Sequence, residues 1–215
     1  MKKLLTLTLV ALIAVAQPAL AQTDTKAKAI LEAVSKKINS LKSLKANFAL
    51  HLISANGKTN QTKKGSFFMK GKKYRLALGD QEIICDTKTV WTYVKAVNEV
   101  QVSSYNPDEQ TISPDKLFTN FYDKEYKYRY AGTKKMGGKT VDVIELTPIG
   151  KDKQFSKVEL AVDKANTIVG GNVFEKNGNR FQYEISGFTP NANLTDAVFT
   201  FDAKKYPGVE VVDLR

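Results

Sequence analysis

The chain is poor in the side chains that most often carry chemistry. It contains one cysteine (Cys85), one histidine (His51) and one tryptophan (Trp91). A single cysteine rules out a disulfide within the chain, and one cysteine with one histidine cannot supply the four ligands of a structural zinc site. Phosphate-binding loops, dinucleotide fingerprints and nucleophile elbows are also missing. We therefore predict that the protein holds no metal and no cofactor.

The remaining routes to catalysis are weak. Cys85 and His51 could form a nucleophile and its base, but both fall in strand patterns, where cysteine behaves as a small apolar side chain. No third group is evident that would orient the histidine. A pair of carboxylates is the other route, and Glu145 and Glu184 lie within strand patterns where they would face solvent. We expect a protein that is not an enzyme.

No apolar run is long enough to cross a membrane. A spanning helix needs about 20 apolar residues, and the run from Leu4 to Val15 has 12. Two lysines precede this run and an Ala-Leu-Ala sequence ending at Ala21 follows it, which is the pattern of a cleavable secretory signal. We predict that residues 1–21 are removed after export. An uncleaved membrane anchor is the alternative.

The rest of the chain, residues 22–215, shows no proline- or serine-rich linker and no internal repeat. Its 194 residues are within the range of one domain and are enough for a sizeable core. We predict a single, monomeric domain.

Positive charge is concentrated near the start of this domain. Residues 22–80 contain 13 basic and 3 acidic residues, whereas residues 81–215 contain 18 and 19. A basic block favours an acidic partner or transient contact with an anionic membrane surface. Because no nucleic-acid-binding motif is present, we expect no nucleic acid. A merely solvated basic face is the alternative.

Hydrophobic periodicity predicts one helix followed by a long series of strands. Between residues 23 and 40, apolar residues recur at spacings of three and four, as in an amphipathic helix. From Leu44 the spacing changes to two, and turn signals such as Asn56-Gly57 separate about eleven strands, the last at 198–201. A second, short helix is predicted at 113–122.

So many consecutive antiparallel strands need closure or near-closure to protect their edges. The predicted fold class is therefore mainly β: an incomplete, unclosed antiparallel barrel of about eleven strands, with the two helices covering an apolar cavity. Ordinary core packing is the alternative for each apolar residue taken singly. The candidate residues of the cavity and its helical lid are Leu31, Val34, Ile38, Leu50, Tyr74, Leu76, Trp91, Tyr93, Leu117, Phe118 and Phe121.

Three stretches of the sequence resemble one family. They read "INSLKSLKANFAL" at the end of the first helix, "EIICDTKTVWTYVKAVNEVQV" in the middle, and "FTFDAKKYPGVEVVDLR" at the end. The most specific positions are Asp86, Lys88, Trp91 and Tyr93, together with the Phe-x-Phe pattern that precedes Pro207-Gly208-Val209. In the same order, and over nearly all of the predicted domain, the chain resembles the LolA-type periplasmic carriers of outer-membrane lipoproteins.

The resemblance implies a periplasmic carrier with a helical lid over the barrel. Such a carrier takes mature triacylated lipoproteins from an inner-membrane ABC transporter, shields their acyl chains and passes them to an outer-membrane acceptor. In the family, a basic residue and a proline open the strand that then reads aromatic-x-Trp, and the basic residue helps to tether the lid. Here Lys70, Gly71 and Leu76 take the basic, proline and tryptophan positions. Lys70 and Arg75 are therefore the candidates for a lid latch.

The same cavity would also suit a free lipid or a glycolipid, so a carrier or sensor of such a lipid is the alternative function. In either case release has to be possible. Each buried methylene contributes about 0.8 kcal/mol, which would make a long acyl chain bind almost irreversibly to a rigid, empty cavity. We predict that side chains of the lid helices fill the cavity of the empty protein and that acyl chains replace them.

Overall fold

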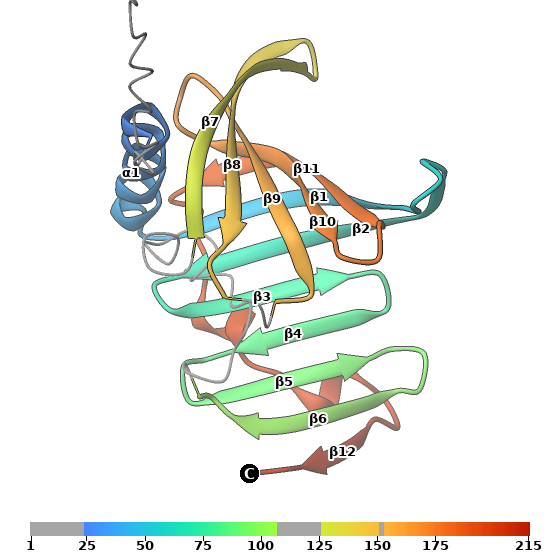
Figure 1. The fold of residues 1–215 in the computed structure, drawn as a ribbon. Coiled ribbons are helices and arrows are strands. Elements are labelled where there is room, and N and C mark those ends of the chain that lie inside the picture. The colour runs from blue at the N-terminus through green and yellow to red at the C-terminus, as the bar shows by residue number, and fades with distance from the viewer. Residues whose placement is uncertain (1–23, 107–125, 151–152) are drawn as a thin grey trace, which may run out of the picture.

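The computed structural model describes residues 24–106, 126–150 and 153–215. This part of the chain forms one α-helix, two short 3-10 helices and one sheet of twelve strands (Figure 1). The elements are α1 (Thr25–Ser40), β1 (Leu44–Ile53), β2 (Thr59–Lys70), β3 (Lys73–Leu78), β4 (Gln81–Cys85), β5 (Thr89–Val94), β6 (Glu99–Ser104), β7 (Tyr126–Met136), β8 (Lys139–Pro148), β9 (Phe155–Val162), β10 (Ile168–Glu175), β11 (Arg180–Pro190), η1 (Asp196–Phe199), η2 (Ala203–Lys205) and β12 (Glu210–Asp213).

The sheet is a curved, open barrel. Its strand order is β12-β6-β5-β4-β3-β2-β1-β11-β10-β9-β8-β7, so β7 and β12 are edges that do not meet. Neighbouring strands are antiparallel except for β12, which runs parallel to β6. Figure 1 shows β7–β9 at a steep angle to β3–β6, as expected of a strongly coiled sheet. The predicted unclosed barrel is confirmed.

Helix α1 forms where the sequence predicts it. The Asp24 carboxylate caps its start, because Oδ1 accepts hydrogen bonds from the backbone N–H groups of Lys26 and Ala27, each at 3.0 Å. The helix ends where Leu41 turns to an extended conformation. No helix in the described ranges is long and apolar enough to cross a membrane.

The apolar face of α1 packs on the concave face of the sheet, at one end of the barrel (Figure 1). Val34 and Ile38 join a buried cluster of side chains from β1–β5, β9 and β10. Ala27 and Leu31 join a second cluster, with Tyr126 of β7 and two residues of β8. The helix thus bridges the two halves of the curved sheet.

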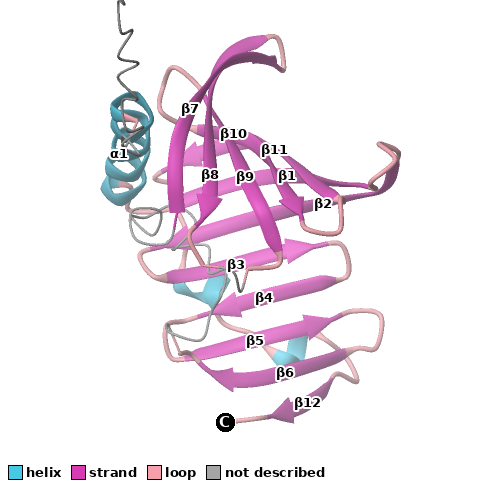
Figure 2. Ribbon diagram, in the orientation of Figure 1, coloured by secondary structure: helices cyan, strands magenta, loops and turns pink. Residues whose placement is uncertain are grey.

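The convex face of β3–β6 is covered by the end of the chain. Figure 2 shows both 3-10 helices beside these strands, and η1 contacts β3. Phe199 in η1 has no exposed surface, and Ile84 and Val100, which face this side, are also fully buried. The protein therefore has apolar packing on both faces of the same strands.

One strand prediction is wrong in detail, and one strand was not predicted. Residues 198–201 alternate like a strand, but part of this segment is the 3-10 helix η1, because it crosses a face of the sheet, where no strand edge is free to pair with it. β12 was not predicted, since four residues are too few to show a period and it pairs in parallel. The predicted helix at 113–122 lies outside the described residues.

We expect Phe199→Ala to lower the free energy of unfolding by about 3–5 kcal/mol, because it removes a fully buried aromatic ring from the convex face. Urea denaturation monitored by the fluorescence of Trp91 measures the change. Val97→Ala is the control, since Val97 is 66% exposed and should change stability by less than about 0.5 kcal/mol. Similar effects of the two substitutions would show that the end of the chain is not part of the folded core.

Candidate functional site

The concave face of the sheet has a covered part and an open part. Next to α1, the inward side chains Leu44, Met69 and Tyr74 are buried. Farther along the strands, inward residues such as Phe48 and Leu76 remain half-buried although they are apolar. An apolar surface that the protein's own core leaves partly open is the type of surface that binds apolar ligands.

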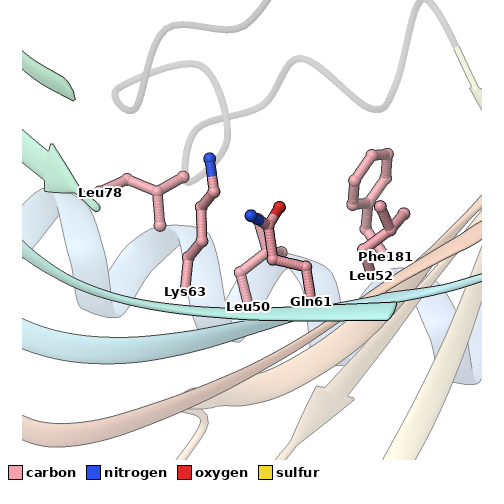
Figure 3. A pocket seen from close by; sticks show the side chains of 6 residues that line it. All are labelled: Leu50, Leu52, Gln61, Lys63, Leu78 and Phe181. Atoms are coloured by element: carbon pink, nitrogen blue, oxygen red, sulfur yellow. The ribbon is translucent and has the colours of Figure 1, made fainter. Parts of the chain in front are cut away.

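A cavity of about 110 Å³ lies in this open part (Figure 3). Three adjacent strands supply most of it, because Leu50 of β1 pairs with Lys63 of β2 on one side and with Tyr183 of β11 on the other. Four of its six lining side chains are apolar. The lining residues are Leu50, Leu52, Gln61, Lys63, Leu78 and Phe181.

Two glycines shape the floor of the concave face. A Cβ at Gly65 would collide with the ring of Phe48 and with the Ala77 carbonyl, and a Cβ at Gly171 would collide with the ring of Tyr183 and the Glu159 carbonyl. Each aromatic ring therefore lies across the neighbouring strand at the point where that strand has no side chain. Both rings therefore lie flat against the sheet and do not project into the cavity.

Tyr183 adds a polar atom to this apolar floor. Its hydroxyl makes no hydrogen bond with the described residues, and burial raises the pKa of Tyr183 above its ordinary value, so the hydroxyl stays protonated. Because it has no partner in the described ranges, this protonated hydroxyl could donate a hydrogen bond to an acceptor atom of a ligand.

Helix α1 is tied down at both of its ends. At the start, Asp24 Oδ2 accepts a hydrogen bond from the Tyr130 N–H of β7 at 2.6 Å, and the Lys26 amine lies 3.6 Å from the centre of the Tyr130 ring. At the other end, Lys37 Nζ donates to the Ala165 carbonyl at 2.7 Å and to Thr167 Oγ1 at 2.5 Å. The hydrogen bond from Tyr130, followed by the one from Ala27, lowers the pKa of Asp24.

Six of the predicted site residues face the concave side. Leu31, Val34 and Ile38 of α1 and Tyr74 of β3 are buried where the helix meets the sheet, while Leu76 is half-buried and Leu50 lines the cavity. Leu117, Phe118 and Phe121 lie outside the described residues.

Trp91 and Tyr93 face the other way, which corrects their predicted place in the cavity. Tyr74 pairs with Cys85, and Cys85 pairs with Val90, so Trp91 next to Val90 points to the convex side. Tyr93 packs there against Phe201 and Tyr206, with ring centres 5.7 and 4.6 Å apart. Alternation in the sequence shows which residues of one strand lie on the same face. Which residues of the next strand join them on that face depends on the turn between the two strands.

Lys70 and Arg75 hold the end of the chain. Lys70 Nζ donates to Asp196 at 2.9 Å and to the Leu194 carbonyl at 3.1 Å. Arg75 forms a 2.7 Å ion pair with Glu82 and donates to the Val198 carbonyl and to the Tyr206 hydroxyl. Burial alone would lower the pKa of Arg75, but the hydrogen bonds and charges of Glu82 and Tyr206 together outweigh this and raise it. In the described structure, both latch candidates thus bind residues 194–206 and not α1.

Cys85 and His51 lie on opposite faces of the sheet. Cys85 is fully buried on the concave side, whereas His51 points outward and its Nδ1 lies 2.9 Å from Thr62 Oγ1. They cannot act as a nucleophile and base pair. Among the described residues, no group of acidic, histidine or cysteine side chains could hold a metal ion.

Sequence analysis missed five of the six cavity residues, namely Leu52, Gln61, Lys63, Leu78 and Phe181. Leu52 and Leu78 continue the alternation of Leu50 and Leu76, so the period of two was a sufficient signal for them. Gln61 and Lys63 required the pairing of β1 with β2, because a polar residue on an inner face breaks the expected pattern.

Comparison with known proteins places this geometry in context. The family model described as outer membrane lipoprotein carrier protein LolA matches residues 39–202. No curated protein sequence matches the chain.

Solved structures share the fold at low sequence identity. An uncharacterized conserved protein from Thermus thermophilus has a TM-score of 0.59 and 15% identity, over 87% of this chain and 99% of that one. The lipoprotein LppX of Mycobacterium tuberculosis has a TM-score of 0.51 and 11% identity, over 80% and 98%. A chain of the MucA/MucB complex of Pseudomonas aeruginosa has a TM-score of 0.51 and 16% identity, over 83% and 62%.

We expect Asp24→Asn to lower the free energy of unfolding at neutral pH. Asparagine has one acceptor oxygen, so it cannot both cap α1 and accept the hydrogen bond from β7. Because the folded pKa of Asp24 is depressed, its stabilising effect is complete above the ordinary value of 3.8 and is lost as the pH falls through the folded pKa. The difference between the two proteins should therefore shrink below pH 3.8.

Urea denaturation over a pH series checks this prediction. Glu32→Gln is the control, because Glu32 is an exposed residue of the same helix. A difference between wild type and Asp24→Asn that stays constant with pH would mean that the carboxylate charge does not hold α1 to β7.

Proposed function

Because the chain belongs to the LolA family, we propose that it is a periplasmic carrier of mature lipoproteins that binds their acyl chains on the concave face of its sheet. Residues 1–21 would direct export and be removed, and residues 22–215 would form the working, monomeric domain. The observation that carries this proposal is the open apolar part of the concave face around Leu50, with its cavity of about 110 Å³.

The size of the cavity suggests how binding would work. Ligand-binding pockets usually have volumes of about 300–1,000 Å³, so the present cavity is too small for a long acyl chain. The apolar floor, however, continues past Phe48 and Leu76 to the side chains that Val34 and Ile38 of α1 cover. An entering acyl chain would extend along this floor and take the place of helix side chains.

Such an exchange would make binding reversible. Each methylene that leaves water contributes about 0.8 kcal/mol, but part of this gain is offset because Val34 and Ile38 lose their contacts with the sheet. The net binding free energy is then the difference between the contacts that the acyl chain gains and the contacts that the two helix side chains lose. A carrier that has to release its cargo to an acceptor needs a difference of this kind.

The proposed partners follow from the family. An inner-membrane ABC transporter would supply the cargo and the energy of loading, and an outer-membrane acceptor with a stronger hold would receive it. The positive charge of residues 22–80 would help the carrier to dock at an acidic surface of its partner or, transiently, at anionic headgroups. The protein would act without a cofactor and would not be an enzyme.

A release assay tests the proposed function. Purified domain is added to spheroplasts that carry a radiolabelled triacylated lipoprotein, and the soluble fraction is examined for label bound to the protein. Label in the soluble fraction supports a lipoprotein carrier. No release, combined with binding of a fluorescent acyl probe, would point instead to a carrier or sensor of a free lipid or glycolipid.

We expect Leu50→Gln to weaken the binding of an acyl probe by about tenfold or more, since burying a leucine side chain contributes about 1.5–3 kcal/mol. Fluorescence titration with the probe measures the dissociation constant. Ala49→Gln is the matched control, because Ala49 is the neighbouring residue on the convex face. Equal weakening by both substitutions would place the binding site elsewhere.

A further inference from the structure

One wall of the cavity is polar, although the surrounding floor is apolar. The inward side chains of β2 change along the strand, from the buried Met69 and Phe67 to the exposed Lys63 and Gln61. Figure 3 shows the Lys63 amine on the same side of the sheet as the side chains of Leu50 and Leu78. A ligand in this cavity therefore meets a positive charge next to an apolar surface.

Within residues 24–106, 126–150 and 153–215, the charge of Lys63 has no acidic partner. Lys70 and Lys73 both form ion pairs with Asp196, at 2.9 and 3.1 Å. Lys63 forms no ion pair with the carboxylates of the described residues, and its only inward neighbours in the cavity lining are apolar apart from Gln61. Its amine is thus available to a ligand.

The stem of the lysine lies beside the turn between β3 and β4. The stem lies against Gly79, where an added Cβ would be 3.4 Å from the Lys63 Cδ. Gly79 turns the chain from β3 to β4 with a φ of +58°, a backbone conformation that favours glycine. The apolar part of the lysine therefore covers the turn and the amine stays at the rim of the cavity.

We infer that the ligand of this cavity is an amphiphile that carries an anionic group, a carboxylate or a phosphate, next to its acyl chain, and that Lys63 binds this group. The inference rests on the proposed function and names the chemical class of its ligand. The acyl chain contacts Leu50, Leu52, Leu78 and Phe181, and the Gln61 amide is placed to donate a second hydrogen bond to the anion. The positive field of residues 22–80 adds a general attraction for anions.

Paired probes test the role of the charge. Dansyl-labelled undecanoate and its methyl ester have the same chain and differ in the anionic group. We expect wild-type protein to prefer the carboxylate, and Lys63→Gln to weaken its binding by about three- to tenfold while the methyl ester binds as before. Lys64→Gln is the matched control, because it removes the same charge from the adjacent, convex-facing position and should change neither constant.

Three results would overturn the inference: equal binding of the two probes by wild-type protein, equal weakening by Lys63→Gln and Lys64→Gln, or loss of methyl ester binding in Lys63→Gln. The first result would show that Lys63 is a solvated residue that does not contact the ligand. The second would show that the overall positive charge of the protein attracts the anion, without a specific contact to Lys63. If neither probe binds to wild-type protein, the proposed function itself fails. Binding of both probes alike would leave the proposed function standing and reject only the anionic class.

A second set of probes separates the two sources of the anion. Tripalmitoyl-cysteinyl peptides with Glu or Gln after the cysteine present the carboxylate on a lipoprotein anchor, and phosphatidate presents a phosphate on a free lipid. Preference for the Glu peptide, lost in Lys63→Gln, assigns the anion to the cargo protein. If the Glu and Gln peptides bind alike, while Lys63→Gln weakens the binding of phosphatidate and undecanoate, the anionic group belongs to a free lipid.

Discussion

The structure depends on a difference in size: helix α1 is much shorter than the width of the sheet on which it packs. A 16-residue helix is about 24 Å long. Twelve strands side by side, at about 4.8 Å each, extend over about 53 Å of sheet. α1 runs across the strands at one end of the barrel (Figure 1) and buries the inward side chains beneath it. Among the described elements, α1 is the one helix that packs on the concave face, so part of the apolar surface there stays only half-buried, and the cavity lies in this part.

The two faces of the sheet make different contributions. On the convex side, residues 194–206 pack over β3–β6. They are fixed by the ion pair of Asp196 with Lys70 and by the packing of Phe201 and Tyr206 against Tyr93. On the concave side, α1 is held by apolar contacts and by a few hydrogen bonds near its ends. The convex packing therefore supports β3–β6 from outside, while α1 is the element that an acyl chain would displace under the proposed function.

Much of the fold could be predicted from sequence, because periodicity reports local geometry directly. The spacing of Ile30, Leu31, Val34 and Ile38 predicted α1, and alternation predicted nearly all of the strands. The site was harder to predict, because it depends on which strands share a face. Two-residue turns at Gly79-Asp80 and at Thr87-Lys88 set the pairing of Tyr74 with Cys85 and of Cys85 with Val90. Counting through these turns would have placed Trp91 and Tyr93 on the convex side.

The attachment of α1 has a consequence for how the protein would respond to dilution. Val34 and Ile38 are on the same chain as the surface that they cover, so the helix is an intramolecular competitor whose effective concentration is fixed by its connection to β1 and not by the amount of protein present. In the empty protein, the part of the apolar surface that lies beneath α1 then stays covered at any protein concentration. Under the proposed function, the free energy that an acyl chain needs to displace α1 would therefore be the same in a dilute as in a concentrated solution of the protein.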